Sequence, residues 1–482
     1  MTDHPAVAPP AGPTGAARRP ALLLTLCGAF FLDVLGTTSV FAASPAIGGA
    51  MRLDATALQW LFTAATLPGG AVLLIGGNLA DRYGGRRMFL LGLAAFTVAS
   101  LGCAVTGLYA VLLACRVLQG VAAGIVVPAS LAVLLASFTD GPERTRALAI
   151  WSTVSGVGAT AGLLLGGLLT GAIGWRWVFL INVPGGVLLA AAAVLLLPRT
   201  PQRGRERLDL VGLVTFTLGA AAVIYGLSDI PEHGASVVAL LAGAAGVAAL
   251  VAFALVERST AFPALPLRLL RLPRVAGGLA ALVAAGLTVD GLLFALTLFT
   301  QQQLGWNALG FAAAAAVMTV TSVGSSWLAG RLVPRLGAPA LAAVGLLVLG
   351  AAGVCFVLMT LGGGAPLLAA GLVLFGVGMG PAYVGGSNAS LLDVPPEDAG
   401  AAGALQNIAF TAGSIIGVAL YATVLSAAPA IAGSERYLPA FAVGALLLLG
   451  VAAALAPARR LRRTPGRRSA EGVSRWRAGR AP

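Results

Sequence analysis

The sequence predicts an all-α integral membrane protein with fourteen transmembrane helices, built as two six-helix bundles with two inserted helices between them. Three observations support this prediction: a composition unsuited to a water-exposed surface, fourteen apolar stretches of membrane-spanning length, and an internal repeat at a nearly constant offset. The polar breaks between the apolar stretches are short, so no soluble catalytic domain fits between them.

The composition indicates that most of the surface faces lipid. Hydrophobic residues make up 58% of the chain and charged residues only 10%, against about 25% charged residues in soluble domains. The net charge of +13 comes entirely from arginine, because the chain has no lysine. These arginines lie in short loops and in the C-terminal tail, which favours a role in membrane orientation over nucleic-acid binding.

Each apolar stretch is long enough for a membrane helix, which needs about 20 residues. The predicted spans cover residues 21–47, 57–79, 88–107, 109–137, 147–173, 177–197, 208–228, 235–256, 275–302, 308–329, 338–360, 366–389, 402–425 and 437–457. The first stretch is longer than the apolar region of a signal peptide, about 7 to 15 residues, so we expect it to be retained. The four cysteines lie in apolar stretches without metal-ligand spacing and are interpreted as core residues: Cys27, Cys103, Cys115 and Cys355.

The loop arginines predict the orientation. An even number of spans places both termini on one side, and the loops on that side hold most of the arginines, whereas the opposite loops hold Arg52, Arg176 and Arg436. The positive-inside rule therefore places both termini in the cytoplasm. The tail from Arg459 to Arg480 is expected to be a disordered basic segment that lies against anionic lipid. Arginine-only basic content with heavy use of Ala and Gly fits a GC-rich genome. This favours a bacterial inner membrane.

An internal repeat determines the architecture. GxLxxRxG occurs at residues 77–84 and again at 330–337, 253 residues later. Two GxxxG pairs recur at offsets of 256 and 255 residues: Gly120 and Gly124 with Gly376 and Gly380, and Gly158 and Gly162 with Gly413 and Gly417. Parallel halves of this kind are typical of rocking transporters, whose substrate site lies near the midplane between the halves.

The repeat predicts seven segments. They are an N-terminal tail (1–20), an N-terminal six-helix bundle (21–197), a cytoplasmic linker (198–207), two inserted helices (208–256), a second linker (257–274), a C-terminal six-helix bundle (275–457) and a basic C-terminal tail (458–482).

Three ionisable residues lie deep within the predicted spans: Asp33, Arg116 and Asp290. A charge in hydrocarbon is costly, so such residues are candidates for function. Asp33 is the first candidate for the proton site, because desolvation in a partly dry cavity favours the protonated carboxyl. The alternative is a structural partner for Arg116, and the two roles are compatible. For Asp290, a cavity position and a shallow interfacial position remain open.

Arg116 shares a helix face with Gln119 and Gly120, because 3.6 residues make one turn. We expect Arg116 and Gln119 to relay protons or to couple the cavity to a gate, with structural hydrogen bonding as the alternative. Gln301, Gln302 and Gln303 are interpreted as anchors at the outer surface.

A cytoplasmic gate is predicted at the loop after the second span. Its charges and tight-turn glycines favour an ion-pair latch between the halves over simple topology fixing. The predicted gate residues are Gly77, Asp81, Arg82, Gly84, Arg86, Arg87 and, from the repeat, Arg335. A further set is assigned to close helix packing, where small residues let backbones approach: Gly120, Gly124, Gly158, Gly162, Gly166 and Gly167.

Four stretches carry a family resemblance. They are GNLADRYGGRR (77–87), RVLQG (116–120), WRWVFLINVPG (175–185) and PPEDAG (395–400), with Gln406-Asn407 after the last. The first resembles the cytoplasmic gating motif of the major facilitator superfamily, and the second its span-four motif linked to proton coupling. From about Leu22 to Leu455 the chain resembles the fourteen-span drug:proton antiporters of that superfamily. The resemblance implies the major facilitator fold and proton-driven drug export.

Two positions depart from the family pattern. The first span of the family reads LDxTxxNxAxP, but here Gly36 and Phe41 stand in place of its Asp and Asn. Asp33 precedes Gly36 by about one turn, roughly 4.5 Å along the helix, and is expected to substitute for the missing acid. In the fifth span GPxxGG becomes residues 162–167 without the proline.

The sequence therefore predicts a secondary transporter that exports hydrophobic or drug-like small molecules by proton antiport. The alternatives are export or uncoupled passage of one metabolite and, more remotely, a receptor or scaffold without transport. No Walker motif, no metal site and no catalytic constellation occurs, so we expect no cofactor and no enzyme activity. The expected partners are a small-molecule substrate, protons and lipids, with no nucleic acid, and the chain is expected to be a monomer.

Overall fold

The computed structural model describes residues 18–138, 141–198, 210–233, 236–259, 267–394, 399–427 and 433–455. These residues form helices joined by short turns, because a backbone in lipid must satisfy its own hydrogen bonds. The N-terminal bundle contains α1 (Arg18–Met51), α2 (Ala55–Tyr83), α3 (Gly85–Val105), α4 (Tyr109–Ser137), α5 (Gly141–Ala172), α6 (Arg176–Leu180) and α7 (Asn182–Leu196).

The second part of the chain repeats this arrangement after an inserted pair. The pair is α8 (Leu210–His233) and α9 (Val237–Ser259), followed by the short helix η1 (Leu267–Arg271). The C-terminal bundle contains α10 (Pro273–Leu298), η2 (Phe299–Gln303), α11 (Ala308–Leu336), α12 (Ala338–Leu358), η3 (Met359–Gly363), α13 (Gly364–Ala389), α14 (Ala399–Ser426), η5 (Gly433–Tyr437) and α15 (Leu438–Leu455).

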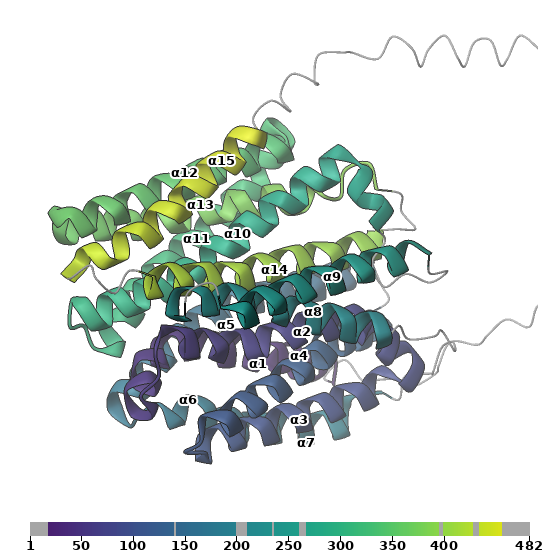
Figure 1. Cartoon of the computed structure of the whole chain (residues 1–482). Helices are drawn as coiled ribbons and strands as arrows, with labels where there is room; N and C mark the ends of the chain where they lie inside the picture. Colours follow the sequence, from purple (N-terminus) through teal and green to yellow (C-terminus); the bar gives the residue numbers. More distant parts are fainter. Residues whose placement is uncertain are drawn as a thin grey trace, which may run out of the picture.

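The predicted fold class is confirmed. In the described ranges, 10 helical stretches are long and apolar enough to cross a membrane, and one of them, Ala338–Ala389, has 52 residues and contains both α12 and α13. Shorter apolar helices fall within α5 and α8, at Val157–Ala172 and Val214–Gly226. This is consistent with fourteen spans. Figure 1 shows the two bundles one above the other, with α8 and α9 between them in front.

The same helix pairs pack in both bundles. In the first bundle α1 packs on α5 and α2 on α4, and in the second α10 packs on α14 and α11 on α13. The two bundles meet mainly where α5 contacts α11 and where α2 contacts α14. The structure therefore shows in three dimensions the repeat that the sequence indicates.

Glycines bring these helix pairs close together. A side chain at Gly120 would collide with the Ala65 carbonyl of α2, and one at Gly413 with the Val283 carbonyl of α10. A side chain at Gly162 would collide with the Thr38 hydroxyl and the Leu35 carbonyl of α1. The remaining predicted packing glycines of the first bundle also face a neighbouring helix: Gly124 faces α2, Gly158 and Gly166 face α1, and Gly167 faces Ala308 and Ala312 of α11.

Two glycines of the GxLxxRxG repeat make matching turns. Gly84 joins α2 to α3 with φ 90°, and Gly337 joins α11 to α12 with φ 81°. A positive φ of this size favours glycine, because a Cβ would strain the backbone. The repeated motif thus specifies the same backbone geometry in both bundles.

The apolar core is shared at one end of the molecule and divided at the other. We call the end at which α1 ends and α2 begins the outer end, and the opposite end the inner end. At the outer end one cluster joins both bundles, for example Phe41 and Phe62 with Phe294 and Phe299. Towards the inner end, one cluster lies within the first bundle and another within the second bundle and the inserted pair. The described conformation is therefore sealed at the outer end.

Candidate functional site

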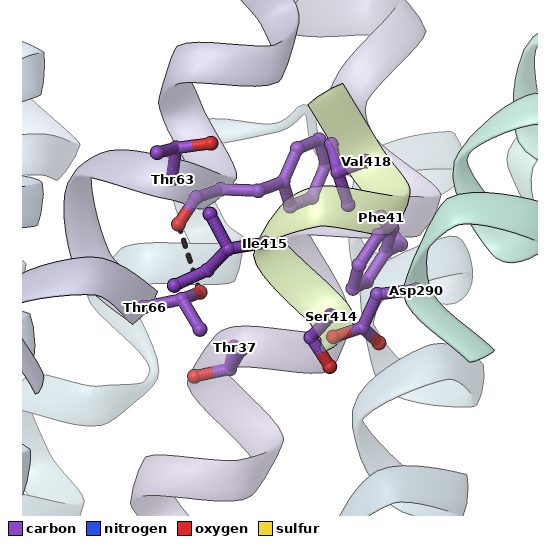
Figure 2. A pocket seen from close by; sticks show the side chains of 9 residues that line it. Thr37, Phe41, Thr63, Thr66, Asp290, Ser414, Ile415 and Val418 are labelled. Carbon is purple, nitrogen blue, oxygen red and sulfur yellow. Dashed lines mark hydrogen bonds between the residues drawn. The ribbon is translucent and has the colours of Figure 1, made fainter. Parts of the chain in front are cut away.

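A pocket lies where the two bundles meet, and Figure 2 shows its lining. Four helices, two from each bundle, contribute the nine residues: Thr37 and Phe41 of α1, Phe62, Thr63 and Thr66 of α2, Asp290 of α10, and Ser414, Ile415 and Val418 of α14. In this closed conformation the pocket has room for about one water molecule. Any movement of one bundle against the other must change its size.

The pocket combines one carboxyl group with several hydroxyl groups. Asp290 is the single charged residue of the lining, and its carboxyl group lies beside the Ser414 side chain in Figure 2. The Thr66 hydroxyl donates to the Phe62 carbonyl oxygen at 2.9 Å. Thr63 is 1% exposed, and its hydroxyl has no hydrogen-bond partner among the described residues. A buried hydroxyl without a partner is costly, so it is available to a water molecule or a ligand.

Aromatic and polar contacts close the pocket on its outer side. Phe41 stacks on Phe62 with ring centroids 4.2 Å apart, and Phe62 meets Phe294 of α10 in a T-shaped pair with ring centroids 5.8 Å apart. The Gln301 amide donates to the Ala42 carbonyl oxygen of α1 at 3.2 Å. Gln301, which the sequence suggests as a surface anchor, thus joins the two bundles. An outward-opening movement must break these contacts.

Asp33 lies beside the pocket without lining it. Residues 33, 37 and 41 are spaced by four, so Asp33 lies near the same face of α1 as Thr37 and Phe41, about one turn closer to the inner end. Its side chain is partly exposed, and it makes no hydrogen bond or ion pair with the described residues. The structure therefore places Asp290 in the pocket lining and Asp33 outside it, about one helical turn closer to the inner end.

Arg116 is held in a buried network behind α2. The side chain is 2% exposed; its Nε donates to the Leu61 carbonyl oxygen and its Nη1 to Gln119 Oε1, each at 2.9 Å. Gln119 Nε2 in turn donates to Ser100 Oγ at 2.8 Å. Arg116 Nη2 has no hydrogen-bond partner in the described part of the chain. Its charge attracts the Asp33 carboxylate without direct contact, so the two are coupled through space.

The predicted gate residues lie at the inner end. Arg86 donates to the Val194 carbonyl oxygen of α7, which belongs to the same bundle. The Arg82 guanidinium lies 5.3 Å from the centre of the Tyr83 ring. Arg87 and Arg335 are exposed, and a side chain at Gly77 would meet open space. The side chain of Asp81 lies outside the described residues, so the latch stays a prediction.

The sequence analysis missed most of the pocket residues. Thr37, Thr63, Thr66 and Ser414 supply its hydroxyl groups, and Phe62 supplies the aromatic contact to the second bundle. The four-residue spacing from Asp33 was a usable signal for Thr37. The sequence carries no comparable signal for Thr63 and Ser414.

The chain matches a known protein family. The family model described as Major Facilitator Superfamily matches residues 26–418. The cephamycin export protein CmcT of Amycolatopsis lactamdurans is 38% identical over 462 residues, which cover 89% of this chain and 90% of that protein. The puromycin resistance protein pur8 of Streptomyces alboniger is 36% identical over 418 residues, with 85% of this chain and 82% of that protein covered.

Solved structures share the fold at low sequence identity. An auto-inhibited peptide transporter of the POT family superposes with a TM-score of 0.67 at 15% identity, covering 93% of this chain and 98% of that chain. A bacterial homologue of the human lysosomal transporter Spinster, inward-facing and unoccupied, gives a TM-score of 0.62 at 17% identity, with 92% and 96% covered. At these identities the similarity concerns the fold alone.

Proposed function

The chain belongs to the major facilitator superfamily, and from this premise we propose that it exports small drug-like molecules, antibiotics among them, in exchange for protons. The observation that carries the proposal is the pocket of Figure 2, which both bundles line and which holds one carboxyl group. The names of the relatives, a cephamycin export protein and a puromycin resistance protein, support export of antibiotics as the direction and substrate class.

In the proposed cycle the pocket opens alternately to the two sides. Separation of the bundles at the inner end admits substrate from the cytoplasm or the inner leaflet. Closure at that end, with opening of the Phe41, Phe62 and Phe294 contacts, then releases it outward. Because each bundle keeps its own helix pairs, a rocking movement changes access by separating the contacts between the bundles.

The two acids take different roles in the proposal. Asp33 is the proton-exchanging group, since it is partly exposed, lacks a hydrogen-bond partner among the described residues and is attracted by Arg116. A proton on Asp33 removes that attraction, which links protonation to the Arg116 network. Asp290 is part of the substrate cavity, where its charge and the Ser414 hydroxyl contact the polar part of a substrate.

The proposed setting is the inner membrane of a bacterium, with both termini in the cytoplasm and the chain acting as a monomer. The family consists of membrane transporters and not of enzymes. The predicted excess of arginine in the inner loops supports the orientation.

Expression in an efflux-deficient bacterial host tests the proposed function. Accumulation of a panel of antibiotics and dyes is measured before and after the proton gradient is collapsed. We expect lower accumulation with the transporter than without it, and loss of that difference when the gradient is collapsed. Export that survives the collapse would favour the uncoupled facilitator, and no export across the panel would favour the receptor or scaffold.

Replacing Asp290 by asparagine is expected to weaken substrate binding. Asparagine keeps the shape of the side chain but removes the single charge of the pocket lining. Hydrogen bonds to charged groups contribute about 1.5–3 kcal/mol, so we expect KM for a cationic substrate to rise about tenfold or more. Initial rates of uptake into inverted membrane vesicles measure this. A neutral substrate of similar size serves as the control, and an unchanged KM for the cation would contradict the role.

A further inference from the structure

The inserted helix α8 lies directly behind the pocket. We call the apolar contacts there the seam cluster: Leu67 of α2, Ile415 and Ala419 of α14 and Ile224 of α8, with Trp60, Ala220 and Ala221 packed against them. Ile415 belongs both to this cluster and to the pocket lining. Ile415 therefore connects the pocket wall with the cluster that contains α8.

One face of α8 makes this contact and the opposite face does not. Ala220 and Ile224 are four residues apart and lie on the same face of the helix. Ile224 is only 5% exposed, whereas Leu218 is 63% exposed and faces away from the bundles. The two isomeric side chains provide a matched pair for experiments, one toward the pocket and one toward the surroundings.

The inserted pair is held firmly in place. Towards the inner end Phe216 of α8 packs against Phe253 of α9, with ring centroids 5.6 Å apart, in the cluster that includes Leu279 of α10 and Leu405 of α14. Glycines hold α8 closely against α9, since a side chain at Gly226 would meet the Ala239 carbonyl and the Gly243 backbone. α8 thus packs against α9 and, through this cluster, against α10 and α14 of the C-terminal bundle.

We propose that α8 is a specificity element of the substrate pocket: its Ala220–Ile224 face supports Ile415 from behind and sets how large a substrate the pocket accepts. The inference rests on the proposed export function and assigns a role to the inserted pair. The physical basis is dense packing, because a change of one or two methylene groups in a close-packed wall shifts its neighbours.

The test compares substrates of different size in the same membranes. The substrates that the wild-type chain exports in the panel are ordered by volume, and kcat/KM is measured for the largest and the smallest in inverted vesicles. Ile224→Ala leaves space behind Ile415, so the ratio of large to small is expected to rise by roughly tenfold, the lower range for a methylene in an apolar pocket. Ala220→Val adds volume to the same face of α8 and is expected to lower the ratio of large to small.

Leu218→Ala is the matched control, because it removes the same number of side-chain carbon atoms from the exposed face. It is expected to leave the ratio unchanged. Fluorescence of a tag in the membrane and the Tm of the purified variants show whether each variant is folded. If Ile224→Ala does not fold, Ile224→Val takes its place. If the large-to-small ratio of kcat/KM is the same in the Ile224 and Leu218 variants, the specificity role is wrong. Export by the wild type would in that case still support the proposed function. Absence of wild-type export would refute both.

Discussion

Asp33→Asn is expected to abolish proton-driven export while leaving the amount of protein in the membrane unchanged. Asparagine cannot exchange a proton, so the proton gradient can no longer drive transport through this residue. The fold should tolerate the change, since the Asp33 side chain is partly exposed and makes no hydrogen bond or ion pair with the described residues. A loss of at least one hundredfold in gradient-driven transport is expected, about 2.7 kcal/mol or more in transition-state free energy.

The measurement is substrate uptake into inverted vesicles with and without an imposed pH gradient. Substrate exchange at equal pH on both sides is the second readout, because it needs no net proton movement and should persist in Asp33→Asn. Asp393→Asn is the matched control: it removes a carboxylate at the inner end that pairs with Arg274 at 3.2 Å and is about half exposed. Exposed ion pairs contribute little to stability. Full gradient-driven export by the Asp33 variant would remove this residue from the coupling mechanism.

Gly120→Val is expected to prevent correct assembly of the N-terminal bundle. The new Cβ would overlap the carbonyl oxygen of Ala65 in α2, and moving the two backbones apart would also break the close approach of Gly124 to Gly69 one turn along. Overpacking of a well-packed core costs about 1–3 kcal/mol, and a collision with backbone falls at or above the upper end of that range. We expect the folded fraction after detergent extraction to fall several-fold.

Fluorescence-detected size-exclusion chromatography of a tagged protein measures the folded fraction. Gly450→Val in α15 is the matched control, since a side chain at that position meets open space and the change in helix propensity is the same. A normal monodisperse peak for Gly120→Val would show that α2 and α4 can separate at little cost. The close approach of these helices would then not be a requirement of the fold.

Much of the fold was predictable because lipid leaves the chain few options. A spanning segment that satisfies its own backbone hydrogen bonds in lipid is a helix, and an apolar stretch of sufficient length shows where each helix lies. The repeat added tertiary information, because Gly158 and Gly162 could be equated with Gly413 and Gly417 before their neighbours were known. The structure then places the first pair against α1 and the second against α10, which are themselves equivalent.

The site was less predictable, because it depends on how each helix is rotated and on which helices meet. Asp33 and Asp290 stood out as charges in apolar stretches, but the sequence could not show that only Asp290 lines the pocket. The hydroxyl residues Thr63 and Ser414 gave no signal, since such residues are common in membrane helices and often bond their own backbone, as Thr38 and Thr288 do. Thr63 differs from these only in having no such partner among the described residues.

The aromatic seal at the outer end has a thermodynamic consequence. Opening that end would wet the faces of Phe41, Phe62 and Phe294, which now pack on one another. Hydration of apolar surface raises the heat capacity, and the attraction that keeps such surfaces together weakens on cooling. The ratio of outward-open to closed molecules should therefore follow a curved van't Hoff plot, and cooling should weaken the contacts at the outer end first.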